Sequence, residues 1–238
     1  AFGPRLGFAF SVRPNTVIRG GFGTFYFRPE GNLIFGQLNL PPFLSNTEYD
    51  NGNLATVSAG AVNSAGLQAG ISGISPTLIN PYTYQYSTGI QQQLPHSVFF
   101  EINYVANVSH HLLRQPNINY PNIASVGANL SNKTAFYNPY KGFQAINESL
   151  SDSNSNYNAL QFYAAKRVGI TTFTFSYTYS KNLGDSSSQN GTLENFTSLA
   201  YNYGPTTNDR RQAVVGTYIV QAPDLRGHNF LIQEVLGG

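Results

Sequence analysis

Residues 171–179 read TTFTFSYTY, and from position 172 onward hydroxyl and aromatic side chains alternate strictly. Successive side chains of a β-strand point to opposite faces, so this segment predicts a strand with one aromatic and one hydroxyl face. Similar alternation recurs in about seven other segments. The connections between them are alternately very short and very long. This combination is typical of a transmembrane β-barrel, which has short turns on one side and large loops on the other.

Composition excludes several other classes of protein. Charged residues make up 10% of the 238 residues and the net charge is +2, which gives no reason to expect nucleic-acid binding. No stretch approaches the roughly 18–20 consecutive apolar residues of a membrane helix. The chain has no Cys, which excludes thiol catalysis and Cys-based zinc sites. It also has no Met and opens next to a predicted strand, so we expect an internal fragment.

The alternation predicts an order of strands and connections. We expect strands over residues 6–12, 16–27, 82–91, 98–107, 157–168, 171–181 and 210–220, and a last strand from about residue 229. Short turns are expected at 14–15, 95–96, 169–170 and 223–228, and long loops at 28–81, 109–156 and 182–209. The expected fold is therefore all-β, an antiparallel meander of about eight long strands forming part of a transmembrane β-barrel. Residues 1–238 form one domain, with short periplasmic turns, long extracellular loops and no plug domain.

Each predicted strand assigns its side chains to two faces. Lipid-facing candidates are Phe8, Phe10, Phe100, Ile102, Phe162, Phe173, Phe175, Tyr177 and Tyr179. Lumen-facing candidates are Arg19, Glu101, Asn103, Gln161 and Arg167. The charged members should face water, because a guanidinium facing lipid at mid-membrane costs roughly 2–4 kcal/mol. Solvation of a water-filled interior would explain each lumen-facing residue as well as a ligand contact would.

Motifs that carry chemistry are weak. His110-His111 is interpreted as a polar loop pair, because neighbouring side chains of an extended chain point apart and a shared metal would need ligands from elsewhere. Asp50-Asn51-Gly52-Asn53 lacks the alternating carboxylates and terminal Glu of a calcium loop. No Ser/His/Asp set has a local signature. We therefore expect no catalytic, cofactor-binding or metal-binding residues, no cofactor and no enzyme activity.

Several strings, taken in order, resemble the C-terminal barrel of the Oar-like group of TonB-dependent outer-membrane transporters, which carry an N-terminal carboxypeptidase-regulatory-like domain. They are FGPRLGFAFS, TVIRGGFGTFY, YSTGIQQQLPHSVFFEINYVANVSHHLLRQPNIN, SNYNALQFYAAKRV, TTFTFSYTYSKNLGDSS and NDRRQAVVGTYIV. The resemblance covers most of the chain outside a loop at about residues 30–81. The absence of Trp and the plain LGG ending depart from the family pattern.

The resemblance implies that this chain is about a third of a barrel of some twenty-two strands in the bacterial outer membrane. The implied function is uptake of a ligand through that barrel. The implied partners are outer-membrane lipid, the remaining strands and plug, an extracellular ligand, and the TonB complex through a segment outside this chain. Two other interpretations stay open: a complete eight-stranded barrel acting as an anchor or adhesin, and a soluble carbohydrate-binding β-sandwich.

Overall fold

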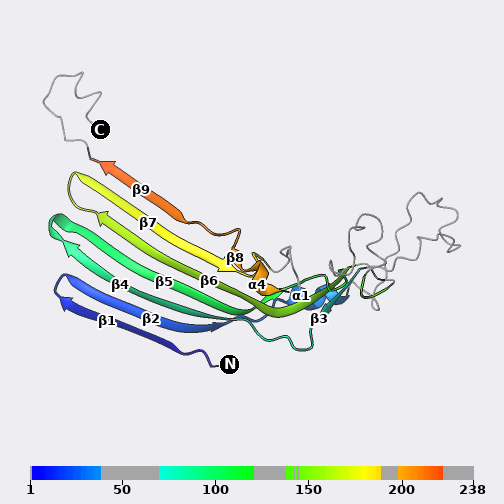
Figure 1. Ribbon diagram of the computed structural model, residues 1–238. Helices are drawn as coiled ribbons and strands as arrows, with labels where there is room; N and C mark the ends of the chain where they lie inside the picture. Colours follow the sequence, from blue (N-terminus) through cyan, green and yellow to red (C-terminus); the bar gives the residue numbers. More distant parts are fainter. Residues whose placement is uncertain are drawn as a thin grey trace, which may run out of the picture.

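Seven long strands form one curved sheet in which each strand pairs with the next long strand along the chain (Figure 1). The computed structural model describes residues 2–38, 70–120, 138–141, 143, 145–188 and 198–221. The long strands are β1 (Arg5–Arg13), β2 (Thr16–Tyr26), β4 (Tyr82–Leu94), β5 (Val98–Arg114), β6 (Ile146–Lys166), β7 (Thr171–Gly184) and β9 (Gln212–Val220). All six pairings between them are antiparallel. The predicted meander is confirmed for these strands, and the predicted last strand lies outside the described residues.

Short connections all lie at one end of the sheet, which we call the turn end, and the longer ones at the opposite loop end (Figure 1). Residues 14–15 join β1 to β2, and the 3-10 turn η2 (Pro95–Ser97) joins β4 to β5. Gly169, between β6 and β7, has a φ of 101°, a left-handed conformation that glycine adopts without a steric penalty. The predicted asymmetry between turns and loops is therefore present at every described connection.

Four further elements lie at the loop end. They are α1 (Gly31–Leu38), β3 (Ile71–Ile74), α4 (Leu199–Asn202) and β8 (Gly204–Pro205). Strand β3 pairs in parallel with the start of β6, from Ile71 opposite Ile146 to Ile74 opposite Ser149. The loop predicted at 28–81 therefore contains structure that alternation did not indicate.

The predicted loop at 109–156 is wrong at both of its bounds. Strand β5 continues to Arg114 and β6 begins at Ile146, and the two stay paired from Ser109 opposite Ser155 to Arg114 opposite Leu150. This part of β6 is rich in Ser and Asn, a composition that suggests a loop. Ladder hydrogen bonds come from the backbone, so a strand with water on both faces does not need an apolar alternation.

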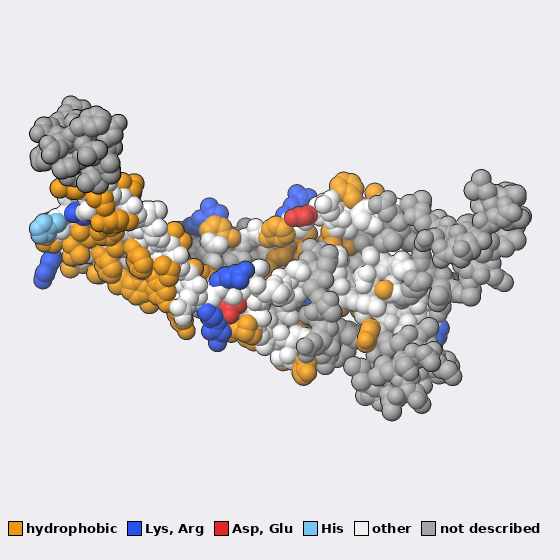
Figure 2. All heavy atoms as spheres, turned by 90° about the horizontal axis from the view of Figure 1, so that it is seen from above, with side chains coloured by type: hydrophobic (Ala, Val, Ile, Leu, Met, Phe, Trp, Pro, Cys, Tyr) orange, Lys and Arg blue, Asp and Glu red, His pale blue; other side chains and the backbone are white. Residues whose placement is uncertain are grey.

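Little apolar surface is buried within the sheet. Among the described residues the buried hydrophobic ones are Leu33, Ala106, Ala159 and Ala165, whereas Phe8, Phe10 and many other large side chains are exposed. Among the described residues, no helix combines the length and apolar character needed to cross a bilayer. Figure 2 shows hydrophobic side chains gathered over the half of the molecule that carries the turn end. A sheet with so little internal core needs another environment to cover its apolar side chains.

Candidate ligand site at the loop end of the sheet

The strand register divides the sheet into two chemically different faces. Residues directly opposite each other in a ladder share a face, so one row can be followed across all seven strands. One such row is Phe10, Ile18, Ile90, Ile102, Phe162, Tyr177 and Val214. We call this side the aromatic face. The next row, on the opposite or polar face, is Ala9, Arg19, Gly89, Asn103, Gln161, Thr178 and Ala213.

All nine lipid-facing candidates lie on the aromatic face. Phe8 and Phe10 are in β1, Phe100 and Ile102 in β5, Phe162 in β6, and Phe173, Phe175, Tyr177 and Tyr179 in β7. The structure therefore groups them as the alternation predicts. That this face contacts lipid stays a prediction.

Polar residues bound the apolar band of this face along β6. Lys166 lies at the turn end and Asn158 toward the loop end, with Leu160, Phe162 and Ala164 between them on the same face. At about 3.3 Å per residue, Asn158 and Lys166 are about 26 Å apart along the strand. This length is close to the roughly 25 Å apolar band of outer-membrane barrels, before the tilt of the strand is considered.

Four of the five lumen-facing candidates lie on the polar face. Arg19, Asn103 and Gln161 share one row, and Glu101 lies two residues from Asn103 on β5. The Asn103 Nδ2 donates to Glu101 Oε1 at 2.6 Å. Arg167 follows the last residue of β6 and is exposed, so no ladder assigns it to a face. A lumen contact for these five residues stays a prediction.

The interpretation of His110-His111 as a loop pair with diverging rings is wrong. Both residues lie in β5, and a positive φ of 56° at His111 marks an irregularity in the ladder. Because of this irregularity both rings approach Tyr82, with centroids 5.4 and 5.6 Å from it. Each Nδ1–H donates to an oxygen of β6, His110 to Asn154 Oδ1 and His111 to the carbonyl of Ser151. They are part of an aromatic cluster at the loop end.

A pocket of about 320 Å³ opens at the loop end, where the polar-face ends of β4, β6 and β7 meet the segment 204–208. This volume is at the lower end of the roughly 300–1,000 Å³ of small-molecule sites. We call it the rim pocket. Its polar lining consists of hydroxyl and amide side chains, among them Thr83, Ser153, Ser155, Asn182, Thr206 and Asn208. Its apolar lining is Phe27, Pro81, Leu112 and Leu113.

Two polar atoms in the rim pocket lining are buried without a partner. They are Asn182 Oδ1 and Thr206 Oγ1. Buried polar side-chain atoms usually have at least one hydrogen-bond partner, so these two atoms are exceptions among the described residues. Alternation in the sequence placed Asn182 and Thr206 in a loop and gave no signal for them. Their meeting depends on Thr206 N–H donating to the Asn182 carbonyl at 3.1 Å.

Asp209 holds in place the part of the rim pocket lining formed by Asn182 and Thr206, which we call the corner. Its Oδ1 accepts the Asn182 N–H at 2.7 Å, and its Oδ2 accepts Arg211 Nε at 2.7 Å. The backbone hydrogen bond from Asn182, with help from Arg211, holds the pKa of the Asp209 carboxyl below its ordinary value. A lowered folded-state pKa means that the carboxylate stabilises the corner above the unfolded pKa of about 3.9 and loses this effect as pH falls through the folded value.

We therefore expect Asp209→Asn to release the corner at neutral pH. At pH 7, the Asn182 amide should exchange its hydrogen faster in this variant than in the native protein, measured by hydrogen–deuterium exchange and mass spectrometry. Asp152→Asn is the control, because Asp152 pairs with Arg114 and does not contact Asn182. Faster exchange at Asn182 in both variants would contradict the assignment. Acidification through the lowered folded-state pKa of Asp209 should reproduce the effect in the native protein and not in Asp209→Asn.

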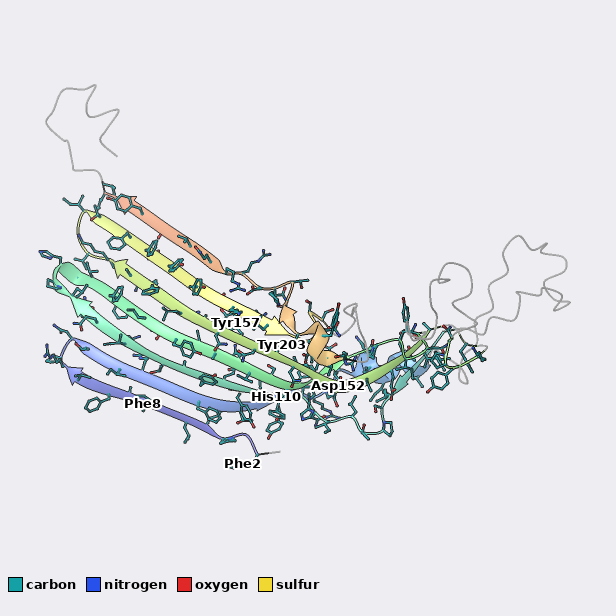
Figure 3. All side chains as sticks on the ribbon, in the orientation of Figure 1. Phe2, Phe8, His110, Asp152, Tyr157 and Tyr203 are labelled. Atoms are coloured by element: carbon teal, nitrogen blue, oxygen red, sulfur yellow. The ribbon has the colours of Figure 1, made fainter. Side chains whose placement is uncertain are left out.

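Figure 3 shows His110, Asp152, Tyr157 and Tyr203 all at the loop end of the sheet, away from Phe8. These four labelled side chains lie where the connections are long. Within the described ranges, no group of three or more His, Asp or Glu residues is placed to hold a metal ion. Within the rim pocket itself, the polar lining consists of neutral hydroxyl and amide side chains.

Comparisons with known proteins agree with a membrane barrel. Residues 1–238 match the family described as outer membrane beta barrel domain. The chain is similar to the crystal structure of the outer membrane transporter YddB from Escherichia coli, with a TM-score of 0.60 and 15% identity over 93% of this chain and 27% of that one. The FrpB iron transporter from Neisseria meningitidis aligns with a TM-score of 0.41 and 13% identity over 76% of this chain and 19% of that one. No curated protein sequence matches the chain.

Proposed function

The chain belongs to the outer membrane beta barrel domain family, and on this premise we propose that it forms part of the wall and extracellular loops of a TonB-dependent transporter. The family and the fold it shares with YddB place the chain in the bacterial outer membrane. The transport role, the dependence on TonB and the Oar-like grouping are proposals. The chain spans 27% of YddB, so the whole protein's activity and partners are proposals too.

The observation that carries this proposal is the two-faced wall. Seven strands share an aromatic face, whose apolar band measured along β6 is about 26 Å long, and a polar face behind it. In an outer-membrane barrel, lipid would cover such an aromatic face and the closed barrel would enclose the polar face in water. On this proposal the turn end lies in the periplasm and the loop end, with the rim pocket, outside the cell.

The size of the wall favours a transporter over a small anchor barrel. Within the described residues, β1 and β9 are the two edges of the sheet and are not paired with each other. Open edges are not tolerated in lipid, so further strands must pair with them. YddB is an outer membrane transporter, and 93% of this chain aligns with only 27% of it, which supports a wall of many more strands. A plug and a TonB-contacting segment would then lie outside this chain.

Uptake in growing cells tests the proposal. We expect cells lacking this protein and cells lacking TonB to leave the same component of a complex medium unconsumed, measured by mass spectrometry of the spent medium. The two deletions should not be additive, because TonB would act through this protein. A component whose uptake depends on this protein and not on TonB would contradict TonB dependence. No change in uptake in cells lacking this protein would favour an anchor or adhesin.

A further inference from the structure

We propose that Lys181 and Arg210 together bind a phosphate group of a lipid headgroup at the extracellular side of the membrane wall. We call these two residues the cation pair. The inference rests on the proposed function for its setting, in which the aromatic face contacts lipid and the loop end lies outside the cell. Its chemistry rests on the strand register, which brings two exposed positive charges together.

The register of β7 and β9 sets the two side chains opposite each other. The Ser180 N–H donates to the Arg211 carbonyl at 3.0 Å, which continues the β7–β9 ladder one residue past the first residue of β9. The next facing residues in this register are Lys181 and Arg210. Facing residues of a ladder share a face, with Cβ atoms about 4.5–5.5 Å apart. Both long side chains can therefore reach one small anion.

The cation pair lies at the boundary of the apolar band on the aromatic face. Lys181 is opposite Asn158, which bounds that band toward the loop end along β6. One row closer to the turn end, the same face carries Leu160 and Tyr179, which are exposed. A cation on the lipid-facing side of a barrel is strongly unfavourable at mid-membrane and almost neutral near the interface. The cation pair is therefore at the depth where headgroups, and not acyl chains, would meet the wall.

The two cations have unused charge. Lys181 and Arg210 are exposed, and neither forms an ion pair with a carboxylate of the described residues. The nearby Asp209 carboxylate is already engaged, because it accepts the Asn182 N–H and Arg211 Nε. Like charges directly opposite each other in a ladder destabilise it. An anion bound between the two side chains would remove this repulsion.

A lipid phosphate suits this position better than a soluble anion does. The cation pair belongs to the aromatic face, whereas a transported solute would pass along the polar face. A guanidinium can donate two parallel hydrogen bonds to phosphate oxygens, and the ammonium adds a second charge. The acyl chains of the same lipid would cover Tyr179 and Tyr177, which continue the face toward the turn end. A free phosphate would gain only the charge contacts.

The test is a titration of the native, detergent-solubilised protein that contains this chain, followed by native mass spectrometry. The probe is diphosphoryl lipid A, a glycolipid with two phosphate groups, and the matched probe is the same lipid with both phosphates removed. We expect saturable binding of the phosphorylated lipid that weakens with added salt, and at least about tenfold weaker binding of the other. Equal binding of the two lipids, or no saturable binding of the phosphorylated one, would overturn the proposal.

Inorganic phosphate is the third probe and separates a lipid site from a site for free phosphate. Added at the same concentration as the lipid, it should leave lipid binding unchanged, because it lacks acyl chains to contact the aromatic face. Displacement of the lipid at equal concentration would show that the cation pair takes free phosphate and would overturn the lipid assignment.

Point variants locate the binding to the cation pair. Lys181→Gln and Arg210→Gln should each weaken binding of the phosphorylated lipid about fivefold, and the double variant about twentyfold or more. Both side chains are exposed, so the variants should fold normally, and either single variant tests the site if the other folds poorly. Lys181→Arg keeps the charge and should bind as the native protein does. Unchanged affinity in the double variant would place the binding elsewhere and overturn the assignment.

Lys166→Gln is the matched control for these variants. Lys166 is on the same aromatic face at the opposite, turn-end boundary of the apolar band, and its ladder partners Val98 and Phe173 are apolar. It removes one positive charge without touching the cation pair, so the affinity for the phosphorylated lipid should stay at the native value. An equal loss in Lys166→Gln and Lys181→Gln would show that only total charge matters and would overturn the proposal.

Lipid binding and uptake separate this inference from the proposed function. The titration needs neither TonB nor an energised membrane, so TonB-independent uptake together with phosphate-dependent lipid binding would remove only the transport proposal. TonB-dependent uptake by a protein that binds both lipid probes equally would remove only the present inference.

Discussion

Replacing Ile102 with arginine should destabilise the folded protein in lipid by about 2–4 kcal/mol, because the new guanidinium would face the hydrocarbon core near its midplane. Ile102 pairs with Phe162, which lies midway between Asn158 and Lys166 on the aromatic face. At this depth the arginine has the longest distance to reach water in either direction. The measurement is the free energy of unfolding of the native protein in lipid vesicles, obtained by guanidinium titration.

Gln161→Arg is the matched control for this substitution. Gln161 neighbours Phe162 in β6 and has the same depth, and its side chain lies on the polar face in the row of Arg19. If water covers that face, the control should change stability by less than about 1 kcal/mol. Similar losses in the two variants would show that lipid and lumen are wrongly assigned. A larger loss in Gln161→Arg than in Ile102→Arg would reverse the two faces.

The fold was predictable wherever apolar and polar side chains alternate along the chain. Phe173, Phe175, Tyr177 and Tyr179 are separated by Thr and Ser, and this pattern fixed both the strand and its face. In outer-membrane barrels a bilayer imposes such a pattern, because only the lipid-facing side of each strand is apolar. Beyond the apolar band the alternation stops, and the Ser- and Asn-rich sequence there predicts a loop where β5 and β6 in fact continue.

The rim pocket could not be predicted for a related reason. Asn182 and Thr206 are separated by more than twenty positions in the chain, and each is an ordinary residue for a polar loop. A backbone hydrogen bond joins Asn182 to Thr206, and the carboxylate of Asp209 accepts a second hydrogen bond from Asn182. Neither contact follows from a periodic pattern in the sequence. The cluster of His110 and His111 with Tyr82 could not be predicted either, because it depends on an irregularity of β5 that no sequence pattern indicates.

Apolar side chains on the polar face are a further feature that alternation did not indicate. Phe99 and Tyr163 pair on this face near the turn end, with ring centroids 6.2 Å apart, and Val215 is exposed on β9. Alternation in the sequence indicates only which kind of side chain is most common on each face. A face enclosed in a barrel also contacts whatever the barrel contains, so a mixed composition is compatible with an interior surface.

Adding a methyl group at Gly89 should be the most damaging small change on the polar face. A Cβ at this position would lie 1.8 Å from Asn103 Oδ1 and 2.7 Å from the Ile102 carbonyl oxygen. The first contact can be relieved by moving the Asn103 side chain, at the cost of its hydrogen bond to Glu101. The second involves the backbone of the neighbouring strand and cannot be relieved without shifting the β4–β5 ladder.

We therefore expect Gly89→Ala to lower the free energy of unfolding by about 1–3 kcal/mol, the usual cost of overpacking. Gly21→Ala is the control on the same face, because its Cβ would meet no atom closer than 3.4 Å, the Leu6 carbonyl oxygen. Since glycine is the less favourable residue in a strand interior, this control should be neutral or stabilising by up to about 1 kcal/mol.

A double variant separates the two sources of strain at Gly89. In Gly89→Ala combined with Asn103→Ala, the side-chain clash is absent and only the contact with the Ile102 carbonyl remains. The double variant should therefore recover part of the stability relative to the sum of the single variants, a coupling measured by a double-mutant cycle. Simple additivity would show that Asn103 does not lie over Gly89. Full recovery would show that the β4–β5 ladder yields freely, which a strand paired on both sides within a membrane wall should not do.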